Sequence, residues 1–163
     1  MNQIISQDEH RIIFEIKSKY GYRSAVIDAD DIEVLKRSWH MDFDKRGNPN
    51  RVAGKIMGKT ISLGGFLTGF CPVDHIDGDI TNNRRHNLRR ATPRDNARNR
   101  RAHSRSKTGM KGVYIDRKKY RAMITVDYNQ AHLGMFENMI DAARAYDAAA
   151  VKYFGEFARL NNL

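Results

Sequence analysis

This 163-residue chain has little cysteine, no long apolar run and no pattern of a secretory signal, and each of these features argues against a class of protein. The single cysteine, Cys71, cannot form a disulfide within the chain and has no thiol partner for a zinc site, which indicates a reducing compartment. No apolar run approaches the ~18 residues of a membrane span. The first ten residues lack the pattern of a secretory signal. We therefore expect an intracellular protein without a membrane partner.

Acidic residues are also too few to balance the basic ones. The chain has 29 lysines and arginines against 19 aspartates and glutamates, a net charge of +10. Nine of the 22 residues from 84 to 105 are arginines, whose guanidinium groups suit bidentate contact with phosphate. The charge favours a nucleic acid as the partner, with a solvated linker or a localisation tract as the simpler alternative for this stretch.

The N-terminal part has the pattern of short strands and one helix. Bounded segments rich in β-branched residues predict strands at 11–16, at 22–27 and, as a pair, within 51–63. Segment 28–39 begins with acidic and ends with basic residues, which favours a short helix through its dipole. Gly64 and Gly65 then interrupt the pattern.

A second pattern follows a polar hinge at 104–109. Three strands of a meander are predicted at 112–115, 120–127 and 132–136. A helix is predicted at 138–153, because small and aromatic side chains recur there at steps of three and four residues. Its expected buried face consists of Ala142, Ala143, Tyr146, Ala149, Ala150, Tyr153 and Phe154. Gly155 is expected to end this helix, and Phe157 and Leu160 to close the core.

One constellation of residues could carry chemistry. Asp74 and His75 stand side by side before a glycine turn, and Asn87 and Asn96 follow. An imidazole can deprotonate water near neutral pH. Asp74 and Asn96 offer the oxygen donors that magnesium prefers, and Asn87 could orient the imidazole. Each residue alone has a simpler explanation as a turn or surface residue, so their order and spacing make the case.

Two stretches of the chain resemble known families. The stretch 73–99, VDHIDGDITNNRRHNLRRATPRDNARN, resembles the HNH (ββα-metal, His-Me finger) motif of phage and intron homing-type endonucleases. The stretch 108–161 looks like the ethylene-response-factor-type (APETALA-like) DNA-binding domain of plants, above all in GVY, LGMF and DAARAYDAAAVKYFGEFARLN. Together they resemble phage HNH endonucleases that carry such a domain at the C-terminus.

The resemblance implies a fold class and a domain organisation. We expect an α+β protein with a ββα-metal nuclease domain at 1–103, its motif at 73–99, and a linker at 104–109. The domain at 110–163 is expected to be a three-stranded antiparallel sheet packed on one helix. Many relatives have a His-Arg pair before the motif, in the region where this chain has Gly64 and Gly65.

The resemblance also implies roles for individual residues. His75 matches the general base, Asn87 the residue that orients it, and Asp74 and Asn96 the ligands of one divalent metal ion, magnesium with manganese as a substitute. The arginines expected to hold double-stranded DNA are Arg84, Arg85, Arg89, Arg90, Arg94 and Arg98. On or beside the C-terminal sheet, the expected DNA contacts are Lys111, Tyr114, Arg117, Lys119, Arg121, Thr125 and His132.

Three functions remain open at this point. The first is a magnesium-dependent, homing-type DNA endonuclease that nicks one strand, because one histidine and one metal ion make a single cutting centre. We expect it to act as a monomer or weak dimer, without a small-molecule substrate, in the cytoplasm of a bacterial host and encoded by a phage. The second is a catalytically inactive DNA-binding regulator, and the third is a nuclease selective for branched DNA.

Overall fold

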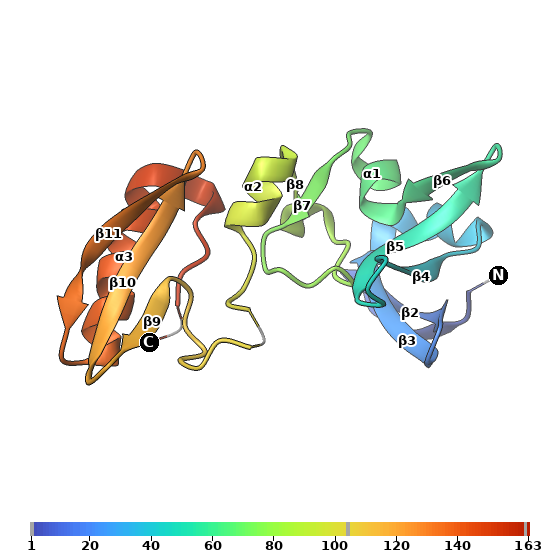
Figure 1. Cartoon of the computed structure of the whole chain (residues 1–163). Coiled ribbons are helices and arrows are strands. Elements are labelled where there is room, and N and C mark those ends of the chain that lie inside the picture. Colours follow the sequence, from blue (N-terminus) through green and yellow to red (C-terminus); the bar gives the residue numbers. More distant parts are fainter. Residues whose placement is uncertain (1, 104, 162) are drawn as a thin grey trace. The chain divides into compact units, whose positions relative to one another are not determined.

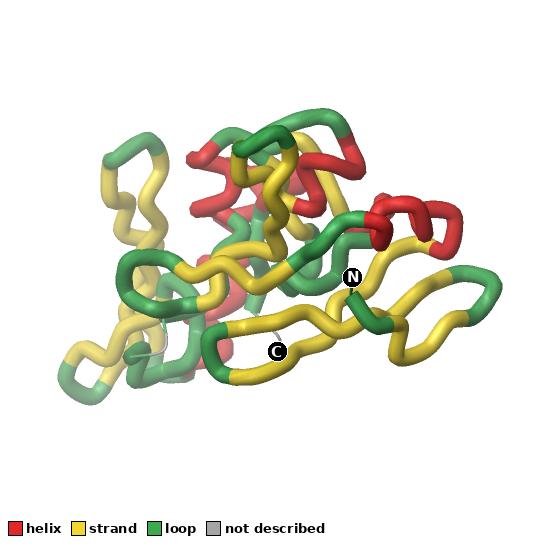
Figure 2. Tube along the Cα trace, turned by 90° about the vertical axis from the view of Figure 1, so that its right-hand side faces the viewer, coloured by secondary structure: helices red, strands yellow, loops and turns green. Residues whose placement is uncertain are grey.

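The computed structural model describes residues 2–103, 105–161 and 163. They form two compact units, divided between Pro93 and Arg94. Helices, strands and loops alternate along the chain and are drawn in red, yellow and green, respectively, in Figure 2. The predicted hinge at 104–109 falls in the second unit, with Ser104 outside the described residues, and the domain boundaries stay predictions.

The first unit is built on a six-stranded sheet (Figure 1). Its strands are β1 (Ile4–Gln7), β2 (Arg11–Ser18), β3 (Gly21–Asp28), β4 (His40–Phe43), β5 (Pro49–Ile56) and β6 (Lys59–Ser62). β2 pairs antiparallel with β1 and β3, and through one parallel pair, Lys17 with His40, with β4. β4, β5 and β6 follow in antiparallel order. The strands predicted at 11–16, at 22–27 and within 51–63 are therefore confirmed.

Alternation along β2 builds the core of this unit. Ile12, Phe14 and Ile16 point to one face, as period-two strand geometry requires, and all three are fully buried. The predicted helix at 28–39 is a 3₁₀ helix, η1 (Ala29–Lys36). Trp39 follows it, is buried, and donates a 2.8 Å hydrogen bond from Nε1 to the carbonyl of Val34.

A small hairpin, β7 (Val73–His75) with β8 (Leu88–Arg90), lies beyond this sheet in the chain. The short helix η2 (Arg85–Asn87) precedes β8, and α1 (Leu63–Thr68) precedes β7. Sequence reasoning missed α1, because Gly64 and Gly65 lie inside it. A Cβ at Gly64 would lie 3.3 Å from side-chain atoms of Val73 and Leu88, so a small residue lets α1 approach the hairpin closely.

The second unit has the predicted architecture, a three-stranded antiparallel sheet packed on one helix. The sheet has the order β11-β10-β9, from β9 (Val113–Asp116), β10 (Lys119–Val126) and β11 (Asn129–Phe136). The helix is α3 (Met139–Phe154), followed by η3 (Gly155–Phe157), and α2 (Pro93–Arg98) spans the division between the units. Among the described residues, no helix combines the length and apolar character that a bilayer span needs.

Helix α3 buries an alanine-rich face against the sheet. Its Asn138 cap accepts a 2.7 Å hydrogen bond from the N–H of Ile140, and Gly155 ends it with a positive φ of 53°. Most of the predicted face is buried, namely Ala142, Ala143, Tyr146, Ala149, Ala150 and Phe154. Two predictions are wrong: Tyr153 and Leu160 are both exposed, each to 46%.

Candidate active site and nucleic-acid interface

The β7–β8 hairpin positions Asp74 and His75. Successive residues of a strand point to opposite sides, so these two side chains leave β7 on different faces. In the antiparallel register, Asp74 lies opposite Arg89 and His75 lies opposite Leu88. The pairing gives the carboxylate a cationic neighbour and places the imidazole at the end of the strand, next to the loop that follows.

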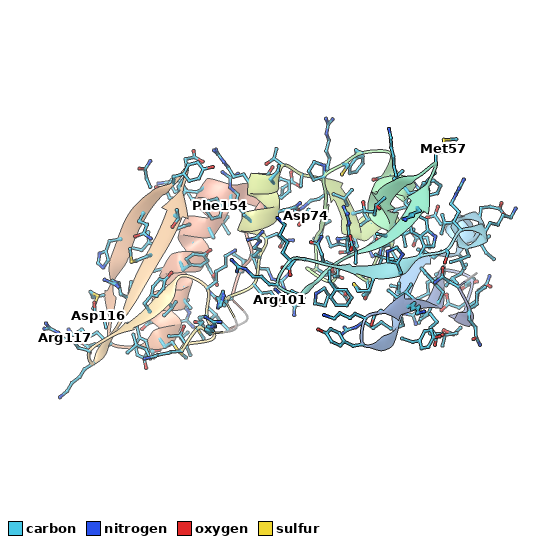
Figure 3. The ribbon with its side chains drawn as sticks, turned by 45° about the vertical axis from the view of Figure 1, so that its right-hand side comes forward. Met57, Asp74, Arg101, Asp116, Arg117 and Phe154 are labelled. Atoms are coloured by element: carbon cyan, nitrogen blue, oxygen red, sulfur yellow. The ribbon has the colours of Figure 1, made fainter. Side chains whose placement is uncertain are left out.

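Asp74, which is labelled in Figure 3, is a buried carboxylate that is paired with an arginine. Its Oδ2 accepts hydrogen bonds from Arg89 at 2.9 Å from Nε and 2.7 Å from Nη2. Both side chains are largely shielded from water, at 8% and 13% exposure, so the pair offsets the cost of burying either charge alone. The structure thus gives Arg89 a contact within the site, while its expected DNA contact stays a prediction.

His75 is half-buried and neutral near pH 7. Burial of the ring lowers the pKa of His75 below its ordinary 6.5, and this effect outweighs the hydrogen bond to Asn83 and the nearby aspartates, which raise it. A neutral imidazole has one nitrogen with a lone pair and can accept a proton. Its Nε2 lies 3.3 Å from Oδ1 of Asn83.

Asn87 holds the loop that follows His75. Its side chain donates to Oδ1 of Asp77 at 3.0 Å and accepts from the N–H of Asp77 at 3.0 Å. Its main-chain carbonyl accepts from the N–H of Ile76 at 2.9 Å. These bonds fix the backbone directly after His75. The orienting role expected of Asn87 stays a prediction.

Sequence reasoning missed the contact between Asn83 and His75. Asn82 and Asn83 are adjacent in the chain, and asparagine is a residue type that is typical of turns. Only the fold distinguishes them: Asn83 is 1% exposed and faces His75, whereas Asn82 donates a 2.7 Å hydrogen bond to Oδ2 of Asp77. A sequence signal that separates the two is absent.

One of the two expected metal ligands, Asp74, lies in the first unit. Asp74 supplies a hard carboxylate oxygen, the donor type that magnesium prefers while it keeps several waters. No group of three or more His, Cys, Asp and Glu side chains suited to a metal occurs among the described residues, as a zinc centre would need. Asn96, the second expected ligand, lies on α2 in the second unit.

Arg84 and Arg85 are bound within the first unit. Arg84 Nε donates to Asp28 at 2.8 Å, and Arg85 forms hydrogen bonds of 2.7–3.2 Å with the carboxylate of Asp31. Burial alone would raise the pKa of Asp28, but the bonds from Arg84 and from the N–H of Arg85 lower it below its ordinary value. Both arginines therefore join η2 to the start of η1.

The other arginines of the basic segment, residues 84–105, differ in their surroundings. Arg90 is exposed. In the second unit, Arg94 forms a 2.8 Å ion pair with Asp127, and Arg98 forms one of 2.9 Å with Asp95. The carboxylates of Asp127 and Asp95 therefore neutralise part of the positive charge of this arginine-rich stretch. The DNA contacts expected of these arginines stay predictions.

The C-terminal sheet exposes a polar face opposite α3. Tyr114, Arg121 and Met135 lie in register across the three strands, and His132 pairs with Met123. Lys119 and Thr125 lie on β10 at the same parity as Arg121, so they share this face. Arg117 stands at the tip of the β9–β10 turn, with a positive φ of 56° (Figure 3). Six of the seven residues expected to contact DNA thus lie on one face or at its edge.

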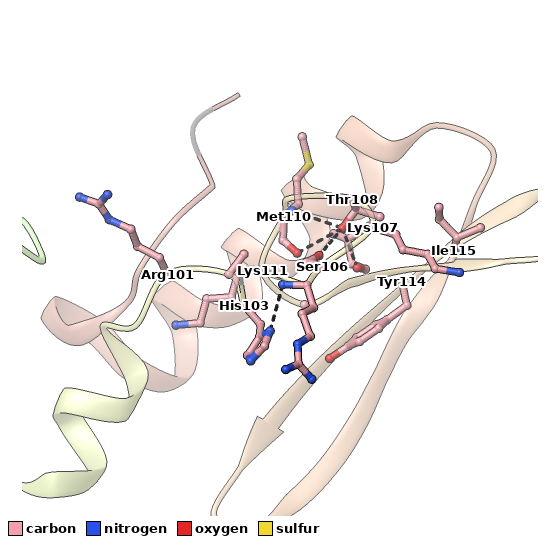
Figure 4. A pocket seen from close by; sticks show the side chains of 13 residues that line it. Arg101, His103, Ser106, Lys107, Thr108, Met110, Lys111, Tyr114 and Ile115 are labelled. Atoms are coloured by element: carbon pink, nitrogen blue, oxygen red, sulfur yellow. Dashed lines mark hydrogen bonds between the residues drawn. The ribbon is translucent and has the colours of Figure 1, made fainter. Parts of the chain in front are cut away.

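Lys111, the seventh, has a different position. Its Nζ donates to the carbonyl of Arg98, and its backbone is bound to Asn161. Burial, followed by the nearby Arg159 and Arg100, lowers the pKa of Lys111 to about 8. It lines a pocket of about 630 Å³ between β9 and the preceding chain (Figure 4). The basic and aromatic side chains of that pocket are Arg101, His103, Arg105, Lys107, Lys111 and Tyr114.

Comparison with known proteins finds similarities in both parts of the chain. Residues 68–98 match the HNH endonuclease family. Over 104 residues the chain is 32% identical to an HNH endonuclease of Acanthamoeba polyphaga mimivirus, covering 64% of this chain and 54% of that protein. Over 53 residues it is 43% identical to an ethylene-responsive transcription factor-like protein of Arabidopsis thaliana, covering 32% of this chain and 24% of that protein.

The β7–β8 hairpin with His75 therefore lies inside the stretch that is similar to the HNH endonuclease family. Proteins of this family are nucleases that bind DNA and generally use one divalent metal ion, so the match supports a nuclease. The chain spans about half the length of the viral relative and about a quarter of the plant relative. A phage origin and an ethylene-response-factor-type second unit stay predictions.

Proposed function

We propose that this protein is a homing-type DNA endonuclease that nicks one strand with His75 as its general base. One observation carries the proposal: within the residues that match the HNH endonuclease family, the buried carboxylate of Asp74 is followed directly in the chain by His75, whose half-buried imidazole has a lowered pKa. A phosphodiester resists attack because it is negatively charged. Its hydrolysis needs a base for water and a positive charge near the phosphate.

In the proposed reaction, His75 takes a proton from a water molecule. The water oxygen forms a bond to the scissile phosphorus, the bond to the leaving sugar oxygen breaks, and that oxygen takes a proton from solvent. Asn87 and Asn83 hold the imidazole through the loop and through Nε2, respectively. A base held in place avoids the entropic cost of orienting it during the reaction.

Asp74 and Asn96 are the proposed ligands of one divalent ion, with magnesium expected and manganese as a substitute. When bound, the ion supplies positive charge that stabilises the scissile phosphate and the leaving oxygen. Arg89 donates to Asp74 at 2.7 Å and so offsets part of the cost of burying this carboxylate. An ionised carboxylate is the form that binds a metal ion.

We propose that the second unit recognises the DNA sequence. The face formed by Tyr114, Lys119, Arg121, Thr125 and His132 offers donors, cations and an aromatic ring on a flat sheet. Sheets of this kind can enter the major groove, where base edges carry a distinctive pattern of donors and acceptors. Arg117 at the turn and the arginines of the basic segment are proposed to hold phosphates.

Conversion of supercoiled plasmid to open circle tests this function. The full chain should nick the plasmid with magnesium or manganese and should stop when a chelator is added. DNA binding should be measured on the same samples, by gel shift with a chelator present. Binding without nicking in either metal, on several DNAs, would contradict the proposal and favour the inactive regulator. Preferential cleavage of branched DNA would favour a structure-selective nuclease.

A further inference from the structure

Asn83 is a buried amide that contacts the candidate base directly. It is 1% exposed, and its Oδ1 lies 3.3 Å from Nε2 of His75. Its own N–H donates to the carbonyl of Val26 at 2.8 Å, which ties it to β3. A buried polar side chain that is fully hydrogen-bonded has one favoured orientation.

The remaining bonds of Asn83 decide which amide atom faces the histidine. Nδ2 donates to the carbonyls of Ile80 and Thr81, both at 3.2 Å. An amide nitrogen donates and a carbonyl oxygen accepts, so exchanging the two would set Oδ1 against two carbonyl oxygens. The amide is therefore held with its oxygen toward His75, and an oxygen can only accept from Nε2.

We infer that Asn83 is a positioning residue that fixes His75 as the Nε2–H tautomer and so makes Nδ1 the nitrogen that takes the proton. A neutral imidazole carries one N–H, so a proton held on Nε2 leaves the lone pair on Nδ1. The catalytic consequence rests on the proposed function. The tautomer itself is a property of the folded protein without metal or DNA.

Strand β3 of the six-stranded sheet and helix α1 both contact the region of Asn83. The N–H of Val26 on β3 donates to the carbonyl of Thr81 at 2.9 Å, so the same strand holds both ends of the turn that carries Asn83. A Cβ added at Gly64 would lie 3.4 Å from Oδ1 of Asn83. α1 and β3 thus enclose the amide. This gives the N-terminal part of the chain a role at the site that its sequence did not indicate.

Nitrogen-15 NMR of the histidine rings tests the inference on the intact, metal-free protein at pH 7.5. We expect a pyrrole-type shift for Nε2 of His75 and a pyridine-type shift for Nδ1. In Asn83→Ala the two shifts should move toward each other as the tautomers exchange, and plasmid nicking should slow by roughly 10–100-fold. Asn82→Ala serves as the matched control and should leave the His75 shifts unchanged.

Two results would overturn the inference. One is a wild-type spectrum in which Nδ1 carries the proton, a measurement that needs no variant and cannot be lost to misfolding. The other is an Asn83→Ala protein that is folded by its amide spectrum and keeps the wild-type ring shifts. Nicking by a protein with the Nδ1–H tautomer would sink this inference and leave the nuclease intact. The expected tautomer in a protein that never nicks DNA would support it while the proposed function fails.

Discussion

Arg84 and Arg85 show how single side chains of a basic stretch can serve the fold. Each binds a carboxylate near η1, Asp28 or Asp31, at 2.8 Å and 2.7 Å respectively. A guanidinium that is paired in this way contributes little net field to a distant phosphate. The pairs also join segments that lie far apart in the sequence, next to the turn that carries Asn83.

The pH dependence of stability should reveal the pair between Asp28 and Arg84. The pKa of Asp28 is lowered in the folded protein, so its stabilisation is full above about pH 4 and is lost as pH falls through the folded pKa. We expect Asp28→Asn to lower the free energy of unfolding by about 1–2 kcal/mol at pH 7. Urea unfolding at several pH values checks this. A deficit that stays constant down to pH 2 would contradict the assignment.

Elements of the second unit were easier to predict than elements around the site. β9, β10, β11 and α3 follow local rules, because turns bound each strand and small residues mark one helix face. α1 escaped because two glycines disfavour a helix in isolation, while close packing against Val73 and Leu88 requires one of them. The strands β1 and β4 escaped because a few residues carry little periodicity.

Some residues of the candidate site could be predicted from the sequence, and others could not. Asp74 and His75 could be found from sequence, because their residue types and their order suit the chemistry. Asn83 and Arg89 could not be assigned their contacts, since these depend on a cross-strand register and on the fold of the loop before η2. Burial, which selects Asn83 over Asn82, is a property of the tertiary structure.

Gly112 should be the least replaceable glycine of the second unit. A Cβ there would lie 1.9 Å from Cδ2 of Tyr146 on α3, and the backbone has a φ of +74°. We expect Gly112→Ala to lower the free energy of unfolding of this unit by about 3–5 kcal/mol, from overpacking and left-handed strain together. Thermal unfolding of the full chain measures it.

Gly109 provides the matched control. Its φ of +67° is similar, but nothing lies within 4 Å of an added Cβ. Gly109→Ala should therefore cost only the backbone strain, about 1–2 kcal/mol. Equal losses for the two substitutions would show that helix α3 does not pack against Gly112 as described.

At the scale of the whole molecule, a net charge of +10 sets a strong salt dependence for DNA binding. The charge is partly paired in both units, so the number of phosphate contacts is smaller than the count of lysines and arginines. Residues on the exposed face of the C-terminal sheet should contribute to binding. Residues on the outer face of α3 should not.

Arg121 and Arg144 make a matched pair for this test. Arg121 lies on the exposed face of β10, and Arg144 lies on the solvent side of α3 beside Asp141. We expect Arg121→Ala to weaken DNA binding and to reduce the slope of log K against log salt by about one. Arg144→Ala should leave both unchanged. Fluorescence anisotropy at several salt concentrations measures the slopes. Equal effects of the two substitutions would contradict a DNA contact on the exposed face of the sheet.

The most direct test of the whole account is the nicking rate of His75→Ala beside that of His86→Ala. His86 lies in the same motif but is exposed and has no assigned role in the reaction. With magnesium and saturating protein, we expect His75→Ala to lose about 10²–10⁴-fold of the rate, the usual contribution of a general base. His86→Ala should nick like the wild type. A folded His75→Ala protein that nicks at the wild-type rate would contradict the central claim that this imidazole activates the water.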